Sequence, residues 1–206
     1  MKVVLINGSP RKNGCTYTAL AEIAGALNKH GVETEIFHIG TKPISGCLSC
    51  YKCYDTGKCI IKDSVNEFAE KYGDWDGLVL GSPVYYAAAN GSLISFMDRL
   101  FYSHKTLFKG KPAAAIASCR RGGATATFDQ LNKYFSIRQM PIVTSQYWNM
   151  VHGHTPEDVK QDLEGLQTMR TLGNNMAWLL KCIKAGKDAG HEMPEGEKPI
   201  RTNFIR

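Results

Sequence analysis

Short runs of apolar residues alternate along the chain with longer segments in which apolar residues recur every three or four positions. The continuous runs predict buried strands at residues 3–6, 77–81, 113–117 and 141–144. The helical spacing predicts helices at residues 17–28, 64–72, 92–101, 125–137 and 157–184, the last one either continuous or broken into a pair. Residues 32–39 alternate instead, which is typical of a strand near a sheet edge. Strands that alternate with helices predict a parallel sheet with helices on both faces.

The composition is that of an ordinary globular protein, with 206 residues of which 43% are hydrophobic and 21% charged. The net charge of +6 is scattered, with Arg120-Arg121 as the notable pair, so we expect anionic small molecules and no nucleic acid as partners. No stretch approaches the ~20 apolar residues of a membrane span, and the first apolar run is too short for a signal peptide. Four of the seven cysteines crowd into one loop, which indicates metal or redox use in the cytoplasm.

The loop after the first predicted strand has the composition of an anion-binding site. Asn7-Gly8 ends the strand, and small or polar residues follow before the first helix begins. The first N–H groups of a helix have no partner within it, and the helix dipole favours negative charge there. Ser9, Thr16 and Thr18 add hydroxyl donors, and Arg11 adds a guanidinium that suits a phosphate. The segment contains neither G-x-G-x-x-G nor Gly-Lys-Ser/Thr, which favours a terminal monophosphate; an ordinary strand–helix connection is the alternative.

Two further loops leave the carboxyl ends of predicted strands, at residues 82–88 and 118–123. Parallel sheets bind ligands at this edge, where the strand order reverses. Tyr85 and Tyr86 offer flat faces to a ring system, although either could be a core or interface aromatic, and residues 118–123 offer amides and guanidiniums that stabilise a reduced flavin. The candidate cofactor-binding residues are Ser9, Arg11, Asn13, Gly14, Cys15, Thr16, Thr18, Pro83, Val84, Tyr85, Tyr86, Ser118, Arg120, Arg121, Gly122 and Gly123.

Over nearly its whole length the chain resembles the NADPH-dependent FMN reductase family. The segments that carry the resemblance are Asn7-Gly-Ser-Pro-Arg11, Gly81-Ser-Pro-Val-Tyr85, Phe96-Met-Asp-Arg99 and Arg120-Arg-Gly-Gly123. The resemblance implies a flavodoxin-like α/β three-layer sandwich, with a five-stranded parallel sheet in the order 2-1-3-4-5 and FMN at the strand ends. It further implies NAD(P)H as substrate and a homodimer or homotetramer. We expect an FMN-binding domain at residues 1–185, with a cysteine-rich insertion at 41–62, and an extended tail at 186–206.

The cysteine-rich insertion resembles that of one branch of this family, the iron–sulfur flavoproteins. Cys47, Cys50, Cys53 and Cys59 follow the spacing C-x2-C-x2-C-x5-C, and such tight runs of thiolates are typical [4Fe–4S] ligands. Zinc is one alternative, although its sites more often use two separated C-x2-C pairs. A loop without metal, reduced or oxidised, is another. His152-x-His154 is a further, weaker candidate for a metal ligand pair.

These features favour an FMN-dependent oxidoreductase that moves electrons from NAD(P)H, or from a reduced ferredoxin-type donor, to a small acceptor such as a flavin or a quinone. Redox chemistry of this kind belongs to the flavin ring, and no catalytic residue is nominated. A flavodoxin-like electron carrier without turnover is the first alternative, although this chain is basic whereas typical flavodoxins resemble acidic shuttles. A flavin sensor whose cysteine loop holds structural zinc is the second.

Overall fold

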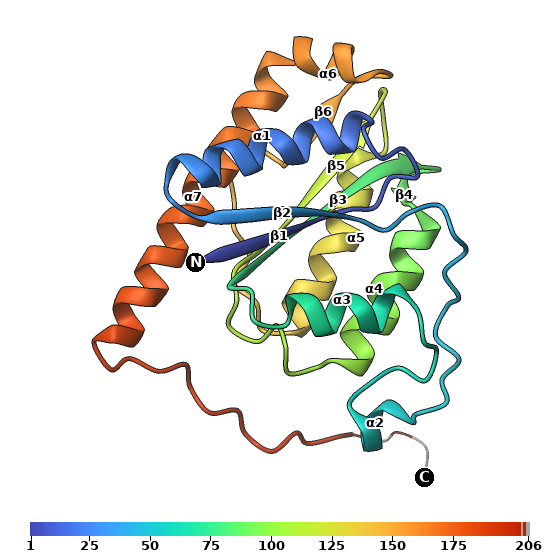
Figure 1. Ribbon diagram of the computed structural model, residues 1–206, viewed down its shortest axis with the longest axis vertical. Coiled ribbons are helices and arrows are strands. Elements are labelled where there is room, and N and C mark those ends of the chain that lie inside the picture. The colour runs from blue at the N-terminus through green and yellow to red at the C-terminus, as the bar shows by residue number, and fades with distance from the viewer. Residues whose placement is uncertain (203, 205–206) are drawn as a thin grey trace.

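The computed structural model describes residues 1–202 and 204, and a mainly parallel sheet forms its centre (Figure 1). The strands are β1 (Lys2–Asn7), β2 (Glu33–His38), β3 (Gly77–Tyr85), β4 (Ala88–Ala89), β5 (Ala113–Cys119) and β6 (Met150–His152). Their order is β2-β1-β3-β5-β6 with every pair parallel, while β4 pairs with β3 in the antiparallel sense. The flavodoxin-like fold class is confirmed, with β4 as a sixth strand outside the expected order.

Helices cover both faces of the sheet, which gives the three layers visible in Figure 1. One face is covered by α1 (Cys15–Lys29), α6 (Pro156–Gln161) and α7 (Leu163–Asp188). The other face is covered by α3 (Ser64–Tyr72), α4 (Gly91–Ser103) and α5 (Ala124–Ile137). The short helix α2 (Cys53–Thr56) lies in the cysteine-rich insertion, at the lower end of the molecule in Figure 1.

The central strands are buried on both sides, which explains their continuous apolar sequence. In β1, Val4 belongs to the core under α3, α4 and α5, whereas Val3 belongs to the core under α1 and α7. The first of these cores is rich in aromatic rings, and the ring centroids of Phe68 and Tyr72 lie 4.7 Å apart. The edge strand β2 remains only partly buried, as its alternating pattern predicts.

The predicted last strand, at residues 141–144, is wrong. This segment makes one isolated bridge, between Ile142 and Ala113, and the last parallel strand of the sheet is β6. Val143 N donates to Ala113 O at 2.8 Å, but the next acceptor of β5, Ala115 O, is bound by Asn149 Nδ2 at 3.1 Å, so the ladder does not continue along this segment. The chain leaves β5 and returns at Asn149, whose carbonyl oxygen accepts a hydrogen bond from Ala117 N at 3.0 Å. The last parallel strand of the sheet is therefore formed by residues 150–152, for which the sequence pattern predicted no strand.

Two other elements differ from the expected boundaries. β3 continues beyond Gly81 to Tyr85, because Val84 and Tyr85 pair with β4 in a hairpin. The long C-terminal helix is broken into the pair α6 and α7, which is one of the two predicted forms. The break falls at Asp162, whose side chain accepts a hydrogen bond from Gly165 N at 2.9 Å and so caps α7.

The chain after α7 is extended and runs along the lower end of the molecule (Figure 1). Lys109 Nζ donates to the carbonyl oxygen of Pro194 at 3.4 Å, which ties this segment to the body. The expected tail, 186–206, begins inside α7, and its positions 203, 205 and 206 lie outside the described residues. Among the helices described, none combines the length and the apolar character that a membrane crossing requires.

Candidate functional site

Loops at the carboxyl ends of β1, β3 and β5 surround a pocket of about 210 Å³. They are the β1–α1 loop, the β3–β4 hairpin and the β5–α5 loop, and the loop after β6 forms a fourth wall. The pocket is lined by Ser9, Arg11, Cys15, Thr16, Pro83, Val84, Tyr85, Ser118, Cys119, Arg120, Gly153 and His154. The structure thus brings together predicted residues from all three loops.

The β1–α1 loop is held in one shape by buried side chains. Ser9 N donates to Asn7 Oδ1 at 3.0 Å, and Ser9 Oγ accepts from Arg11 N at 3.1 Å. From the start of α4, Asn90 Nδ2 donates to the carbonyl oxygen of Gly8 at 2.7 Å. Because Asn7 and Asn90 are both buried, these bonds are shielded from water and fix the shape of the loop.

The N-terminus of α1 lies at this pocket, because Cys15 and Thr16 line it. Gly14 is the residue that precedes the helix, no side chain in the described part of the chain caps it, and its first turn has no acidic residue. Thr16 is 1% exposed, and its Oγ1 has no hydrogen-bond partner among the described residues. Free N–H groups and a buried hydroxyl without a partner are donors that a ligand oxygen would satisfy.

The second wall is the hairpin of β3 and β4. Tyr85 pairs with Ala88, so Tyr86 and Ala87 form a turn between the strands. Both turn residues have positive φ, 50° and 59°, as in the type I′ turn, whose twist matches that of the strands. Tyr85 lines the pocket, whereas Tyr86 is fully exposed at the tip. The hairpin therefore brings one of the two predicted tyrosines to the site.

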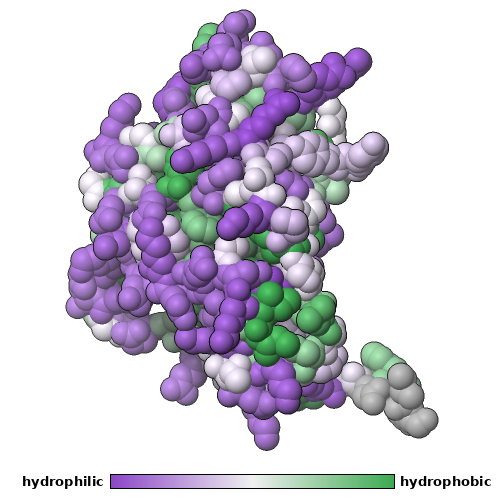
Figure 2. All heavy atoms as spheres, turned by 45° about the vertical axis from the view of Figure 1, so that its right-hand side comes forward, coloured by the Kyte–Doolittle hydropathy of each residue, from purple (hydrophilic) through white to green (hydrophobic). Residues whose placement is uncertain are grey.

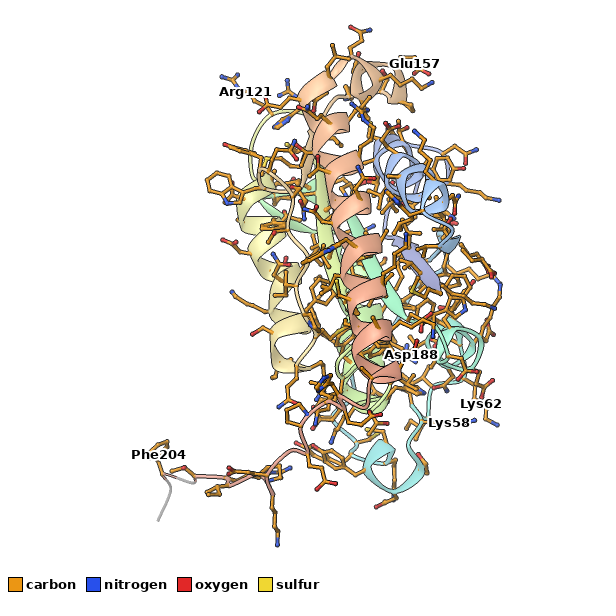
Figure 3. All side chains as sticks on the ribbon, turned by 90° about the vertical axis from the view of Figure 1, so that its left-hand side faces the viewer. Lys58, Lys62, Arg121, Glu157, Asp188 and Phe204 are labelled. Atoms are coloured by element: carbon orange, nitrogen blue, oxygen red, sulfur yellow. The ribbon has the colours of Figure 1, made fainter. Side chains whose placement is uncertain are left out.

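Several predicted residues lie beside the pocket and not in its lining, namely Asn13, Gly14, Thr18, Tyr86, Arg121, Gly122 and Gly123. Thr18 Oγ1 donates to the carbonyl oxygen of Gly14 at 3.2 Å, so this hydroxyl is used within α1. Arg121 points away from the body at the upper end of the molecule, whereas Arg120 lines the pocket (Figure 3). Gly123 precedes α5 and supports the hairpin, since a Cβ there would lie 2.8 Å from Ala87 Cα.

Sequence reasoning missed the fourth wall, which consists of Gly153 and His154. Gly153 N donates to the carbonyl oxygen of Cys119 at 3.0 Å, and Gly153 O accepts from Cys15 Sγ at 3.7 Å. This loop therefore joins the first and third walls. A signal was present, because only three residues separate the apolar pair Met150-Val151 from Thr155-Pro156, a typical helix start.

Two thiols, those of Cys15 and Cys119, line the pocket. Burial raises the pKa of each thiol above its ordinary value. Both groups therefore stay protonated at neutral pH and behave as small apolar side chains, because the thiolate is the nucleophilic form of cysteine.

The cysteines of the insertion surround a second, smaller pocket. Its lining is Cys47, Leu48, Cys50, Tyr51, Cys53, Cys59, Ile60, Ile61, Arg99, Tyr102 and Ser103. All four predicted thiols are thus brought together, with apolar and aromatic neighbours. Figure 2 shows apolar side chains gathered on the lower part of the molecule, and Leu48 of this loop is 62% exposed.

The four thiols do not converge on a single ion. Within residues 1–202 and 204, no group of three or more His, Cys, Asp or Glu side chains is placed to hold one metal ion. A structural zinc site needs all its ligands in tetrahedral contact with one ion. The four thiols share the lining of one pocket, and cysteine thiolates are donors in both zinc sites and iron–sulfur clusters.

The chain matches the family described as NADPH-dependent FMN reductase over residues 1–155. It belongs to this family. An iron-sulfur flavoprotein of Methanocaldococcus jannaschii is 36% identical over 192 residues, which cover 89% of this chain and 100% of the relative. An iron-sulfur flavoprotein of Archaeoglobus fulgidus is 36% identical over 198 residues, which cover 89% and 98%. A solved structure, the NAD(P)H:quinone oxidoreductase from Methanothermobacter marburgensis, is similar in fold, with a TM-score of 0.65, 17% identity and coverage of 85% and 96%.

This member of the FMN reductase family is an FMN-dependent oxidoreductase, and its two pockets lie at opposite ends of the molecule. In Figure 1 the loops after β1 and β3 lie at the upper end, and α2 lies at the lower end. Figure 3 shows the same separation from another side, with Arg121 at the top and Lys58 and Lys62 of the cysteine loop near the bottom.

Proposed function

We propose that this FMN-dependent oxidoreductase holds FMN in the pocket at the ends of β1, β3 and β5 and takes its electrons from NAD(P)H. The observation that carries the proposal is the buried Thr16 hydroxyl, which has no partner among the described residues and lies beside the uncapped N-terminus of α1. A terminal phosphate would satisfy the hydroxyl and the free N–H groups together, and Arg11 would add positive charge. When bound, FMN supplies one-electron and two-electron redox chemistry.

The other walls suit the ring system of a flavin. Tyr85 offers an aromatic face, and Ser118 with Arg120 lies on the opposite loop. Backbone amides and positive charge near the pyrimidine side of the ring stabilise its reduced, anionic form. The thiols of Cys15 and Cys119 stay neutral because of their raised pKa values, so they add no negative charge that would oppose this effect.

We further propose that Cys47, Cys50, Cys53 and Cys59 hold a [4Fe–4S] cluster as thiolates. The four thiols around one pocket and the iron-sulfur flavoproteins among the relatives support this assignment. A bound cluster supplies one-electron steps. All seven cysteines are free, which suits a reducing compartment such as the cytoplasm.

The separation of the two pockets within one chain supports a homodimer or homotetramer. In such an assembly the cysteine loop of one copy would lie near the FMN pocket of another. Leu48, Tyr51 and Ile60 of the loop are 62%, 56% and 49% exposed, and exposed apolar groups of this kind favour burial against a partner. The acceptor in this proposal is a small molecule such as a flavin or a quinone, and a reduced ferredoxin-type protein is the alternative donor.

The test is spectroscopy of protein purified without oxygen. We expect flavin absorption that bleaches on addition of NADH or NADPH, a broad cluster shoulder, and about four iron and four sulfide atoms per chain. Protein that neither contains FMN nor binds added FMN would contradict the assignment of the pocket. Bleaching by a reduced ferredoxin but not by either nicotinamide would indicate an electron carrier. One zinc ion per chain without sulfide would indicate that the cysteine loop is a structural zinc site.

A further inference from the structure

Arg99 is a buried arginine that the proposed FMN chemistry does not use. It belongs to α4, it is 1% exposed, and it lines the pocket of the four thiols. Burial of a guanidinium is unfavourable unless its charge is paired and its N–H groups find acceptors. The contacts of Arg99 therefore show which groups compensate for the burial of its charge.

Each of the five N–H groups of Arg99 donates a hydrogen bond, and every acceptor lies in the cysteine loop or next to it. Nη1 and Nη2 donate to Oδ2 and Oδ1 of Asp63 at 2.6 and 2.8 Å. The same two nitrogens donate to the carbonyl oxygens of Ser45 and Ile61 at 3.3 and 3.1 Å. Nε donates to the Sγ atom of Cys59 at 3.3 Å.

These contacts fasten both ends of the cysteine loop to α4, because Ser45 precedes the first thiol and Ile61 follows the last. Asn66 of α3 holds the same end through the backbone. Its Nδ2 donates to Cys59 O at 2.8 Å, and its Oδ1 accepts from Cys59 N at 3.1 Å. Cys59 is thus fixed through both its backbone and its sulfur.

We infer that Arg99 is a positioning residue for the cluster, an inference that rests on the proposed [4Fe–4S] site. Arg99 holds Cys59 as a ligand, and its Nε–H donor to Sγ favours the reduced cluster. Reduction adds negative charge, which spreads onto the ligating sulfur atoms, so a hydrogen bond to Sγ raises the reduction potential. Asp63 pairs with the guanidinium charge, so the effect at Sγ comes from the local donor more than from net charge.

The test is Arg99→Lys in protein purified anaerobically with both cofactors. Lysine keeps the positive charge that Asp63 requires but lacks the planar fork, so it cannot serve Asp63, Ser45, Ile61 and Cys59 together. We expect full FMN content, because Arg99 does not line the FMN pocket. We also expect either a several-fold loss of iron and sulfide or, where the cluster is retained, a shift of its midpoint potential to a lower value.

The matched control is Arg170→Lys, which makes the same change at an arginine paired with Glu22, on α7 and α1. It should leave iron, sulfide and the cluster potential unchanged. Arg99→Lys with unchanged iron, sulfide and potential, whatever its thermal stability, would overturn the inference and leave Arg99 as a structural clamp. Wild-type protein without iron and sulfide would instead overturn the proposed cluster, and this inference with it.

A measurement on the wild type decides the matter where Arg99→Lys fails to fold. Protein labelled with ¹⁵N-arginine is reduced, and electron–nuclear double resonance is recorded on the cluster signal. A ¹⁵N coupling is expected, because a hydrogen bond from Nε to a ligating sulfur carries spin density to the nitrogen. A spectrum without such a coupling would overturn the inference.

Discussion

Thr16 of α1 and Gly81 of β3 are in close contact, since a Cβ atom at position 81 would lie 2.8 Å from Thr16 Cγ2. The missing side chain at Gly81 leaves room for the Thr16 methyl group. Thr16 Oγ1 is then buried at the pocket and has no partner within the described residues. A buried hydroxyl without a partner lowers stability in the free protein and becomes useful when a ligand oxygen accepts from it.

The first prediction is that Thr16→Val weakens FMN binding about tenfold, which corresponds to about 1.4 kcal/mol. Valine keeps the shape of threonine and removes only the donor. The stability of the FMN-free protein should stay the same or rise, because the unsatisfied hydroxyl is gone. The measurement is flavin-fluorescence titration of the FMN-free protein, with thermal unfolding alongside. Thr127→Val is the control, because Thr127 Oγ1 is also buried without a partner in the described chain but does not line the pocket.

The second prediction concerns charge at the phosphate. Arg11→Glu should weaken FMN binding by about 2–3 kcal/mol or more, because it replaces a positively charged donor with a negative charge that repels the phosphate. Arg121→Glu makes the same change at an arginine that points away from the pocket, and its effect should be much smaller. The measurement is the FMN content of the purified variants. Full occupancy in Arg11→Glu, or equal losses in the two variants, would contradict this placement of the phosphate.

The third prediction separates the two cofactor sites. Cys53→Ser should abolish the cluster absorbance and leave FMN bound, because Cys53 lines the second pocket and not the first. Cys182→Ser is the control at an exposed cysteine of α7, and it should keep both chromophores. Absorption spectra with iron assays after anaerobic purification provide the measurement. Loss of FMN together with the cluster in Cys53→Ser would show that the two sites are structurally coupled.

The fourth prediction concerns the contact between α1 and α7. A Cβ atom at Gly173 would lie 2.7 Å from Ala26 Cβ and 2.8 Å from the carbonyl oxygen of Ile23, so Gly173→Ala forces the helices apart. We expect a loss of about 1–3 kcal/mol in the free energy of unfolding, as for other overpacked sites. Gly25→Ala in α1 is the matched change in open space, and it should raise stability by about 0.5–1 kcal/mol through helix propensity. Urea unfolding monitored by circular dichroism measures both.

The fifth prediction is a pH dependence at Glu35. Hydrogen bonds from Lys71 Nζ at 2.5 Å and from Tyr72 OH at 2.6 Å lower the pKa of this carboxyl below its ordinary value of 4.5. A lowered folded-state pKa means that the contribution to stability is present above 4.5 and is lost as the pH falls through the folded-state value. The side chain is 41% exposed, so solvent screening limits the contribution to about 0.5–1 kcal/mol.

The test of that dependence is Glu35→Gln, studied by urea unfolding at pH 7 and again in steps below pH 4.5. The variant should be less stable than the wild type at pH 7, and the difference should shrink as the pH falls. Glu33→Gln is the control, because Glu33 of the same strand pairs with Lys2 of β1 at a longer distance, 3.7 Å, and is more exposed. A difference between Glu35→Gln and the wild type that stays constant with pH would contradict the assignment.

The sequence by itself determined the alternation of strands and helices, the loops at the strand ends and the spacing of the four thiols. These features are local, since a strand buried on both faces must be apolar throughout and a covering helix must repeat its apolar residues every three or four positions. The same reasoning placed Thr16 and Arg11 at a helix N-terminus, where the structure shows them lining the first pocket.

Only the tertiary structure decided which distant segments pair. Residues 141–144 and 150–152 are both short and apolar, and the choice of the second as the last strand depends on register with Ala117–Cys119. That choice brings Gly153 and His154 to the pocket. The tertiary structure also brings Arg99 of α4 within hydrogen-bond distance of the sulfur of Cys59, which lies 40 positions earlier in the chain. Such contacts leave no periodic trace in the sequence, because a buried hydrogen bond is defined by where two elements meet in space and not by the residues on either side of each partner.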